Sequence, residues 1–407
     1  MRRTTLTTLS LAIAASLLQA QAPKEKAFAP TIKTSGLLQV WYSQMLDSNL
    51  RLNLSGTPYY SPRADFKENT FAIRRAEIKF SGEIVKGVKW SLMIDPVNQP
   101  GSPLQDLDLT YDFGNGLELS VGQYKINSQT LEGLTSSADL MFAERSQIGA
   151  RIGDKRDRGA KLAYAFGDPK GFRGKTSFIV ANGNTEVSSG KANDLNAGKD
   201  YAFRLEFWQG QAHNFGFYTL QGSTDVKDSD PGFRALTFTG GPSAQGVLDN
   251  RDKTSNLGAF YAYRQGPWRL EAELITGVLG RRYASVGTTA SSAKREHLDQ
   301  KFLSYVLSGS YVTGKHTFGL RYDFSNWNSG DQWYGATNPY KKANGDYTPA
   351  FTEITAGYTY ALDPAKPRAA NIKLNYINRS KNFLLPRAGQ TGEQGGDTLL
   401  AAFQVAF

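Results

Sequence analysis

The stretch FGLRYDFS at residues 318–325 alternates between apolar and polar side chains. Successive side chains of a β-strand point to opposite faces, so Leu320 and Tyr322 share one face while Arg321 lies on the other. The stretch LDLTYDF at residues 107–113 alternates in the same way. Alternation recurs along most of the chain and helical periodicity is almost absent, which predicts an all-β protein.

The alternating segments predict sixteen strands. These cover residues 31–44, 70–82, 87–96, 104–113, 117–125, 158–166, 171–182, 199–209, 213–221, 254–264, 266–277, 300–313, 315–324, 349–362, 368–379 and 397–407. The connections alternate between short turns rich in Gly or Pro, such as GDPKG and VTGKH, and longer polar segments. This alternation of short and long connections is typical of outer-membrane barrels, which have short periplasmic turns and long external loops.

Period alone does not say which face of the strands is buried. The second face carries many charges, and aromatic residues stand at strand ends, where a membrane interface would lie. Those aromatic residues are Tyr263, Trp268, Tyr311, Phe324 and Tyr360. We therefore predict a transmembrane antiparallel β-barrel of about 16 strands, with lipid outside, a water-filled lumen and a terminal aromatic, Phe407, on its last strand.

The N-terminal residues 1–22 have the organisation of a signal peptide, with Arg2 and Arg3 before an apolar core and an Ala-Gln-Ala cleavage site. Residues 23–407 then form one barrel domain, since no compositional break divides them. Export to the cell outer membrane argues against nucleic acid as the partner of this basic chain, whose formal net charge is +10.

Catalytic residues are not evident. The chain has no cysteine and three histidines, and none of the histidines has a partner at metal-ligand or Ser-His spacing. We expect no enzyme activity, no metal and no cofactor.

The polar strand faces supply both signs of charge to the predicted lumen. Eight bases and ten acids lie there: Arg75, Lys79, Lys161, Arg204, Arg269, Arg321, Lys373 and Arg379, with Glu77, Asp106, Asp108, Asp112, Glu118, Glu206, Glu271, Glu273, Asp323 and Glu353. We expect most of them to form cross-strand ion pairs that hold the wall.

Residues 126–157 form the longest candidate for a segment inside the barrel. They include Leu131, Leu134, Leu140, Met141 and Phe142, which are unusual in a loop exposed to water. A segment that folds back onto the wall explains these apolar residues and would narrow the pore. A solvated outer loop is the alternative.

Two adjacent arginines stand in the second predicted strand, FAIRRAEIKFSG. Arg75 belongs to the luminal face, which places Arg74 on the lipid face. An arginine is tolerated there only near the rim or where a β-bulge turns it inward. Phe71 and Ile73 share the phase of Arg75, so we predict a bulge that brings both guanidinium groups into the lumen.

Two blocks of sequence resemble the phosphate-selective porin family (porin O/P) of Gram-negative outer membranes. One is residues 71–96, and the other contains GQYK at 122–125, LEGLTSS at 131–137 and ERS at 144–146. The resemblance implies a trimeric porin whose third loop narrows the channel and whose arginines guide anions. One departure is Gly133, where the most phosphate-selective members have a lysine; Lys125 or Arg145 would then substitute.

The predicted anion pathway and constriction comprise Arg74, Arg75, Lys79, Lys125, Arg145, Arg151, Arg204 and Arg321. The leading hypothesis is passive diffusion of small anions, including phosphate or polyphosphate, through a homotrimer embedded in outer-membrane lipid. The alternatives are a weakly selective general porin for small hydrophilic solutes and a plugged structural or adhesive barrel.

Overall fold

A computed structural model describes most of the predicted strands and part of the connections. The described residues are 28–46, 50–52, 58–60, 69–97, 103–125, 130–153, 156–183, 199–225, 251–279, 300–326, 329–330, 350–380 and 397–407. The predicted signal peptide lies outside them. Within these ranges, no helix has the length and apolar character needed to cross a membrane.

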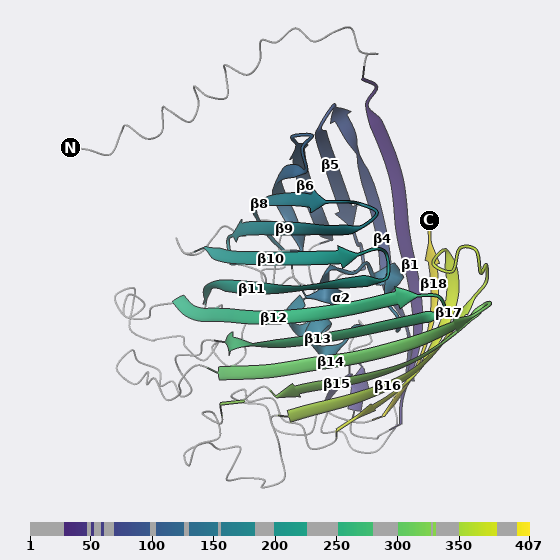
Figure 1. The fold of residues 1–407 in the computed structure, drawn as a ribbon. Helices are drawn as coiled ribbons and strands as arrows, with labels where there is room; N and C mark the ends of the chain where they lie inside the picture. Colours follow the sequence, from purple (N-terminus) through teal and green to yellow (C-terminus); the bar gives the residue numbers. More distant parts are fainter. Residues whose placement is uncertain are drawn as a thin grey trace, which may run out of the picture.

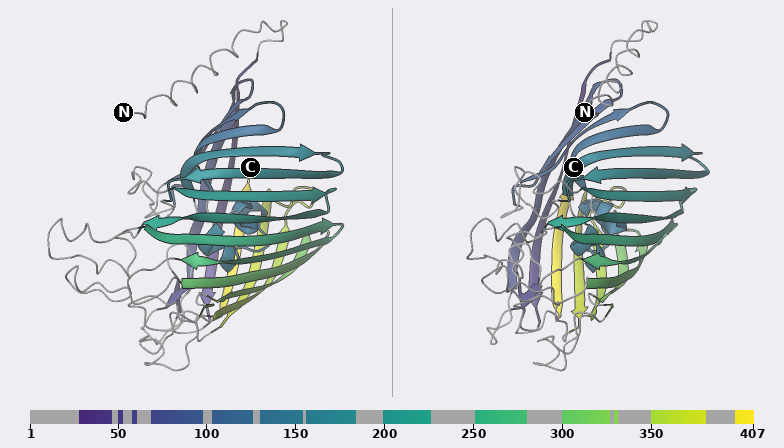
Figure 2. Two further views of the ribbon diagram at one scale, coloured as in Figure 1. Left: turned by 60° about the vertical axis from the view of Figure 1, so that its left-hand side comes forward. Right: turned by 90° about the vertical axis from the view of Figure 1, so that its left-hand side faces the viewer.

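Sixteen of the described strands form one closed antiparallel barrel (Figures 1 and 2). They are β1 (Thr31–Met45), β4 (Asn69–Val85), β5 (Val88–Ile94), β6 (Leu104–Asp112), β7 (Leu117–Lys125), β8 (Arg156–Gly167), β9 (Phe172–Ala181), β10 (Asp200–Gln209), β11 (His213–Asp225), β12 (Arg251–Gln265), β13 (Trp268–Leu279), β14 (Gln300–Thr313), β15 (His316–Asn326), β16 (Ala350–Ala361), β17 (Ala370–Arg379) and β18 (Thr398–Ala406). β1 pairs with both β18 and β4 and thereby closes the sheet. Because the barrel is closed, the backbone N–H and C=O groups of its strands can hydrogen-bond to neighbouring strands, whereas lipid offers them no partner.

The predicted all-β barrel and its sixteen strands are confirmed, with strand ends that differ by a few residues. One detail was wrong: the connection 45–69 contains two short paired strands, β2 (Leu50–Leu52) and β3 (Pro58–Tyr60). Strands of three residues are too short to show an alternation that sequence reasoning can detect.

The short turns lie where Gly-rich stretches predicted them. Gly87 follows β4 with φ 84°, and Gly266 follows β12 with φ 57°. These left-handed conformations are the ones that tight hairpins require and that glycine adopts without strain.

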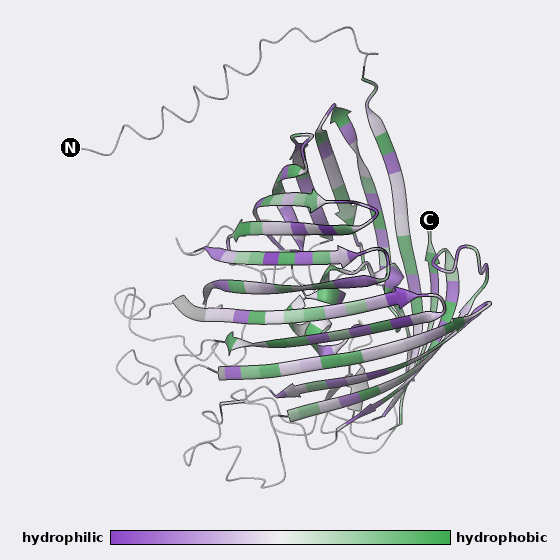
Figure 3. Ribbon diagram, in the orientation of Figure 1, coloured by the Kyte–Doolittle hydropathy of each residue, from purple (hydrophilic) through white to green (hydrophobic). Residues whose placement is uncertain are grey.

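The strand faces point as predicted, with apolar side chains outward and charges inward. On β15, Leu320 is 59% exposed whereas the next residue, Arg321, is 1% exposed. Figure 3 shows the same alternation of hydropathy along many of the strands. The outer face therefore suits lipid, and the inner face carries the ionic groups.

A β-bulge interrupts β4 at the paired arginines. Gln39 of β1 lies opposite Arg75, and the next residue, Val40, lies opposite Ile73, so Arg74 is the extra residue. Ile73 is exposed outward and Arg75 is buried inside, which confirms the predicted change of phase.

Asp95 stabilises the chain beside this bulge. Its Oδ1 accepts the backbone N–H of Ala76 at 3.1 Å and that of Val97 at 3.3 Å. β4 and β5 pair regularly only from Ile78 and Ile94 onward. The carboxylate of Asp95 therefore supplies an acceptor to Ala76 where the ladder of β5 has ended.

A segment between β7 and β8 folds into the barrel (Figure 1). It contains α2 (Leu131–Leu134), the 3₁₀ turn η1 (Ser137–Asp139) and the π turn η2 (Gly149–Gly153). We call residues 130–153 the inserted segment. Its place inside the barrel confirms the prediction of an in-folded third loop.

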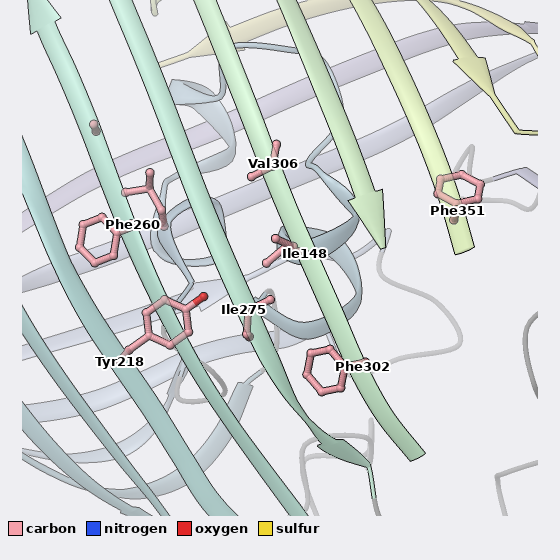
Figure 4. Close-up of a cluster of buried hydrophobic side chains, with 9 residues drawn as sticks. Ile148, Tyr218, Phe260, Ile275, Phe302, Val306 and Phe351 are labelled. Carbon is pink, nitrogen blue, oxygen red and sulfur yellow. The ribbon is translucent and has the colours of Figure 1, made fainter. Parts of the chain in front are cut away.

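Apolar side chains hold the inserted segment against one half of the wall. Leu131 and Ile148 join a buried cluster with Tyr218, Phe260 and Ile275 and further residues of β14 and β16 (Figure 4). Of the five apolar residues predicted to pack on the wall, four are buried, whereas Leu134 is exposed and lines a cavity. The inserted segment thus packs against the wall at β11–β14 and β16.

We expect Asp95→Ala to lower barrel stability by about 1–3 kcal/mol, because it leaves the Ala76 N–H without its acceptor. Asp95→Asn keeps the Oδ1 acceptor and is the matched control. Heat-dependent electrophoretic mobility of the folded protein measures the loss. Equal unfolding temperatures for the two variants would contradict the role given to this carboxylate.

Candidate channel constriction

A cavity of about 730 Å³ lies between the inserted segment and the half of the wall made by β1 and β4–β8. The segment contributes Leu134, Ser136, Ser137 and Ala138 to its lining. The inserted segment thus occupies part of the lumen beside this cavity. This arrangement is that of a constriction.

Bases outnumber acids around this cavity. Its basic side chains are Arg74, Arg75, Lys79, Lys125, Arg156 and Arg368, and its acidic ones are Glu77, Asp95 and Asp106. Several are paired: Arg156 Nε lies 2.7 Å from Asp106 Oδ1, and Arg75 Nε lies 3.5 Å from Glu77 Oε1. The potential in the cavity therefore depends on which bases retain uncompensated charge.

Both neighbouring arginines reach the cavity, as predicted from the bulge. Arg75 is buried and donates to Gln39 Oε1 at 2.7 Å, which fixes its orientation. Arg74 is partly open, with its guanidinium 5.1 Å from the centre of the Trp41 ring. Its Nη2 lies 3.5 Å from Glu144 Oε2 of the inserted segment.

Glu144 remains ionised in this position. Burial would raise its pKa, but the charges of Arg74 and Arg75 and the backbone N–H of Arg145 outweigh it, so the pKa of the Glu144 carboxyl lies below its ordinary value. The inserted segment therefore presents a carboxylate to the arginines of β4.

Lys79 lies four residues after Arg75 on β4 and shares its luminal face. Among the residues that the structure describes, its ammonium group has no ion-pair or hydrogen-bond partner. Its charge is thus available to solutes in the cavity.

Lys125 comes from the end of β7 and reaches the inserted segment. Its Nζ donates to the carbonyl oxygen of Gly133 at 2.8 Å. A side chain on Gly133 has no room, because a Cβ there would lie 2.3 Å from Thr130 Oγ1 and 2.5 Å from Gly153 O. The ammonium of Lys125 thus occupies the neighbourhood of the position at which the resemblance implies a lysine.

Arg145 lies inside the inserted segment and does not line the cavity. It donates to the carbonyls of Glu132 and Thr135, the latter at 3.0 Å, and to Ser137 Oγ at 3.1 Å. Glu132 Oε2 in turn accepts the N–H of Ser146 at 2.5 Å. The two sequence blocks LEGLTSS and ERS are therefore the two arms of one folded unit.

Arg321 anchors that unit to the wall. It lies 2.8 Å from Glu353 Oε1 and 3.1 Å from Asp323 Oδ2, and donates to the carbonyl of Glu144 at 2.9 Å. Its guanidinium also covers the ring of Phe142 at 5.0 Å. The burial of Arg321 and its partners indicate a structural role for this residue.

Arg204 also lies away from the cavity. It pairs with Glu206 at 3.0 Å and stacks 4.1 Å from the ring centre of Phe260. The backbone of Arg151 belongs to η2, but its side chain is outside the described part of the structure. Of the eight predicted site residues, Arg74, Arg75, Lys79 and Lys125 are thus the ones brought together around the cavity.

Two further bases line the cavity without having been placed in the predicted pathway. Arg156, at the start of β8, belongs to the basic run Arg145, Arg151, Lys155, Arg156 and Arg158, whose surplus of positive charge predicts a patch near the constriction. Arg368 lies between β16 and β17 and pairs with Asp139 of η1 at 3.3 Å. Nothing in the sequence around this turn indicates that its side chain reaches the inserted segment.

The expected cross-strand ion pairs are present in the wall. Arg379 Nε of β17 lies 2.8 Å from Glu353 Oε2 of β16, and Arg264 Nη2 of β12 lies 2.9 Å from Glu271 Oε1 of β13. Arg269 pairs with Glu271 along β13 at 2.8 Å and donates to the carbonyl of Asp139 at 3.0 Å, so it links the wall to the inserted segment.

A closed barrel of sixteen strands with an apolar outer face, a charged lumen and an inserted segment beside an open cavity is a transmembrane porin. The chain belongs to the phosphate-selective porin O and P family, whose model matches residues 49–347. It is accordingly a channel protein of the outer membrane. Among curated proteins, none matches this chain.

Solved structures share the fold at low sequence identity. An anion-selective porin from Comamonas acidovorans has a TM-score of 0.54 at 14% identity, over 93% of this chain and 100% of its own. The outer membrane channel DcaP of Acinetobacter baumannii has a TM-score of 0.59 at 12% identity, over 94% and 99%. OmpT of Vibrio cholerae in its trimer form has a TM-score of 0.52 at 10% identity, over 93% and 100%.

We expect Gly357→Val to displace the inserted segment from β16, because a Cβ at residue 357 would lie 2.7 Å from Phe142 Cδ1. Such overpacking costs about 1–3 kcal/mol and pushes the Phe142 ring toward the cavity. Single-channel conductance should fall. Gly309→Val is the control, because the nearest atom to a Cβ there is the mobile end of Leu270, at 3.1 Å. Wild-type conductance in the Gly357 variant would contradict this packing.

Proposed function

We propose that the channel conducts small anions by passive diffusion, with phosphate and polyphosphate as candidate solutes. The observation that carries this proposal is the cavity beside the inserted segment, where six bases face three acids. A surplus of positive charge in a narrow, low-dielectric passage raises the local concentration of anions. The family name and the anion-selective porin of similar fold point in the same direction.

The candidate pathway is the row Arg74, Arg75 and Lys79 on β4, together with Lys125 at the end of β7. Lys79 is the strongest candidate for a selectivity residue, since no partner in the described structure compensates its charge. Arg145, Arg204 and Arg321 would act by holding the inserted segment and the wall, not by contacting solutes.

Phosphate specificity is the narrower part of the proposal. The space at Gly133 excludes a loop lysine, and the ammonium of Lys125 at its carbonyl would supply positive charge there instead. A general porin with weak charge preference is the second candidate function. It is favoured by Glu77, Asp95 and Asp106, which lie in the same cavity as the bases.

The reversal potential of the purified channel in a KCl gradient across a planar bilayer tests the anion preference. We expect the anion-selective sign, and a cation-selective sign would overturn the proposal. Lys79→Glu should lower the ratio of anion to cation permeability several-fold, because it reverses an uncompensated charge. Lys170→Glu, on an exposed turn, makes the same change of net charge away from the cavity and should leave the ratio close to wild type.

We further propose that the mature protein is a homotrimer of residues 23–407, released from a signal peptide at 1–22. The trimer form of OmpT, which shares the fold, supports the oligomeric state, and the N-terminal sequence supports the cleavage. Native mass spectrometry in detergent should give three times the mass of a chain that begins at Pro23. A monomeric mass would exclude the homotrimer, and a chain that retains Met1 would exclude the cleavage.

A further inference from the structure

Hydrogen bonds from β15 and β17 hold the backbone around Glu144. The N–H of Ala143 donates to Asn375 Oδ1 at 2.8 Å, and the carbonyl of Glu144 accepts from Arg321 Nη1 at 2.9 Å. Its Oε1 accepts the N–H of Arg145 at 2.9 Å. The backbone is thus fixed to β15 and β17, while Oε2 faces Arg74 on β4.

The pair of Glu144 and Arg74 is partly open to solvent. Their side chains are 22% and 21% exposed, whereas Arg321 and its partners are almost fully buried. Arg74 lines the cavity, and the ring of Trp41 covers part of its guanidinium. A solute anion in the cavity can therefore reach the same guanidinium that Glu144 contacts.

We propose that Glu144 is a tethered counter-ion at the anion pathway, which competes with permeating anions for Arg74 and so weakens their binding. This inference rests on the proposed anion conduction. A channel needs binding sites that are favourable enough for ions to enter and weak enough for them to leave. A fixed carboxylate beside the first arginine of the row meets the second requirement, because an incoming anion must displace it.

The charge of Glu144 should therefore set the concentration at which conductance saturates. Glu144→Gln retains the length of the side chain and an oxygen that can accept from the N–H of Arg145. It removes the charge that faces Arg74. Partly exposed ion pairs contribute up to about 1 kcal/mol, so we expect the half-saturating concentration of potassium phosphate to fall about two- to five-fold.

The experiment measures single-channel conductance against potassium phosphate concentration for wild type, Glu144→Gln, and Glu144→Gln combined with Arg74→Gln. The fall should be present in the single variant and absent in the double variant. Glu206→Gln is the matched control, because it removes the charge of a carboxylate that pairs with Arg204, a buried arginine that does not line the cavity. It should saturate as wild type does.

An unchanged half-saturation in Glu144→Gln overturns the role of Glu144, as does a fall that persists without Arg74. Glu144→Asp keeps the charge but withdraws it from Arg74, and should give a smaller shift in the same direction. This second variant decides the matter if the first does not fold. A cation-selective wild-type channel would instead overturn anion conduction itself, so the two failures are distinguishable.

Discussion

Hydrogen bonds from barrel side chains to backbone carbonyls hold the inserted segment, and the constriction depends on them. Lys373, Arg269 and Arg321 donate to carbonyl oxygens at residues 139–144. Residues 140–146 of the inserted segment form no helix or strand, and their buried polar groups would otherwise be unsatisfied, at a cost of several kcal/mol in total. The charged inner wall is therefore a scaffold for the segment as well as a lining for the pore.

The arginines of the lumen consequently have two environments. Arg321 and Arg204 are buried and ion-paired against the segment or the aromatic core, whereas Arg74 lies at the edge of open space. All three lie on strands of the same barrel and have the same chemistry. Which of them lines the open cavity is decided by the part of the wall on which the inserted segment packs.

Sequence reasoning predicted the barrel well because period-two alternation and loop length are local properties. It also located the bulge at Arg74. The apolar residues Phe71 and Ile73 alternate in phase with the polar Arg75, and not with the apolar residues that follow it. It predicted the inserted segment from the apolar content of residues 126–157. It did not separate pathway bases from anchoring bases, because contacts such as that of Arg321 with the carbonyl of Glu144 join segments that are distant in sequence.

The sequence by itself determined the closed barrel, the direction of its faces and the position of the bulge, because each follows from the order of neighbouring side chains. The tertiary structure alone decided where the open cavity lies. Arg368 reaches it from a turn, and Lys125 meets the carbonyl of Gly133 only because the segment folds back. The paired arginines of β4 acquire a carboxylate, Glu144, through the same folding. These contacts depend on long-range packing inside the lumen, which no local pattern encodes.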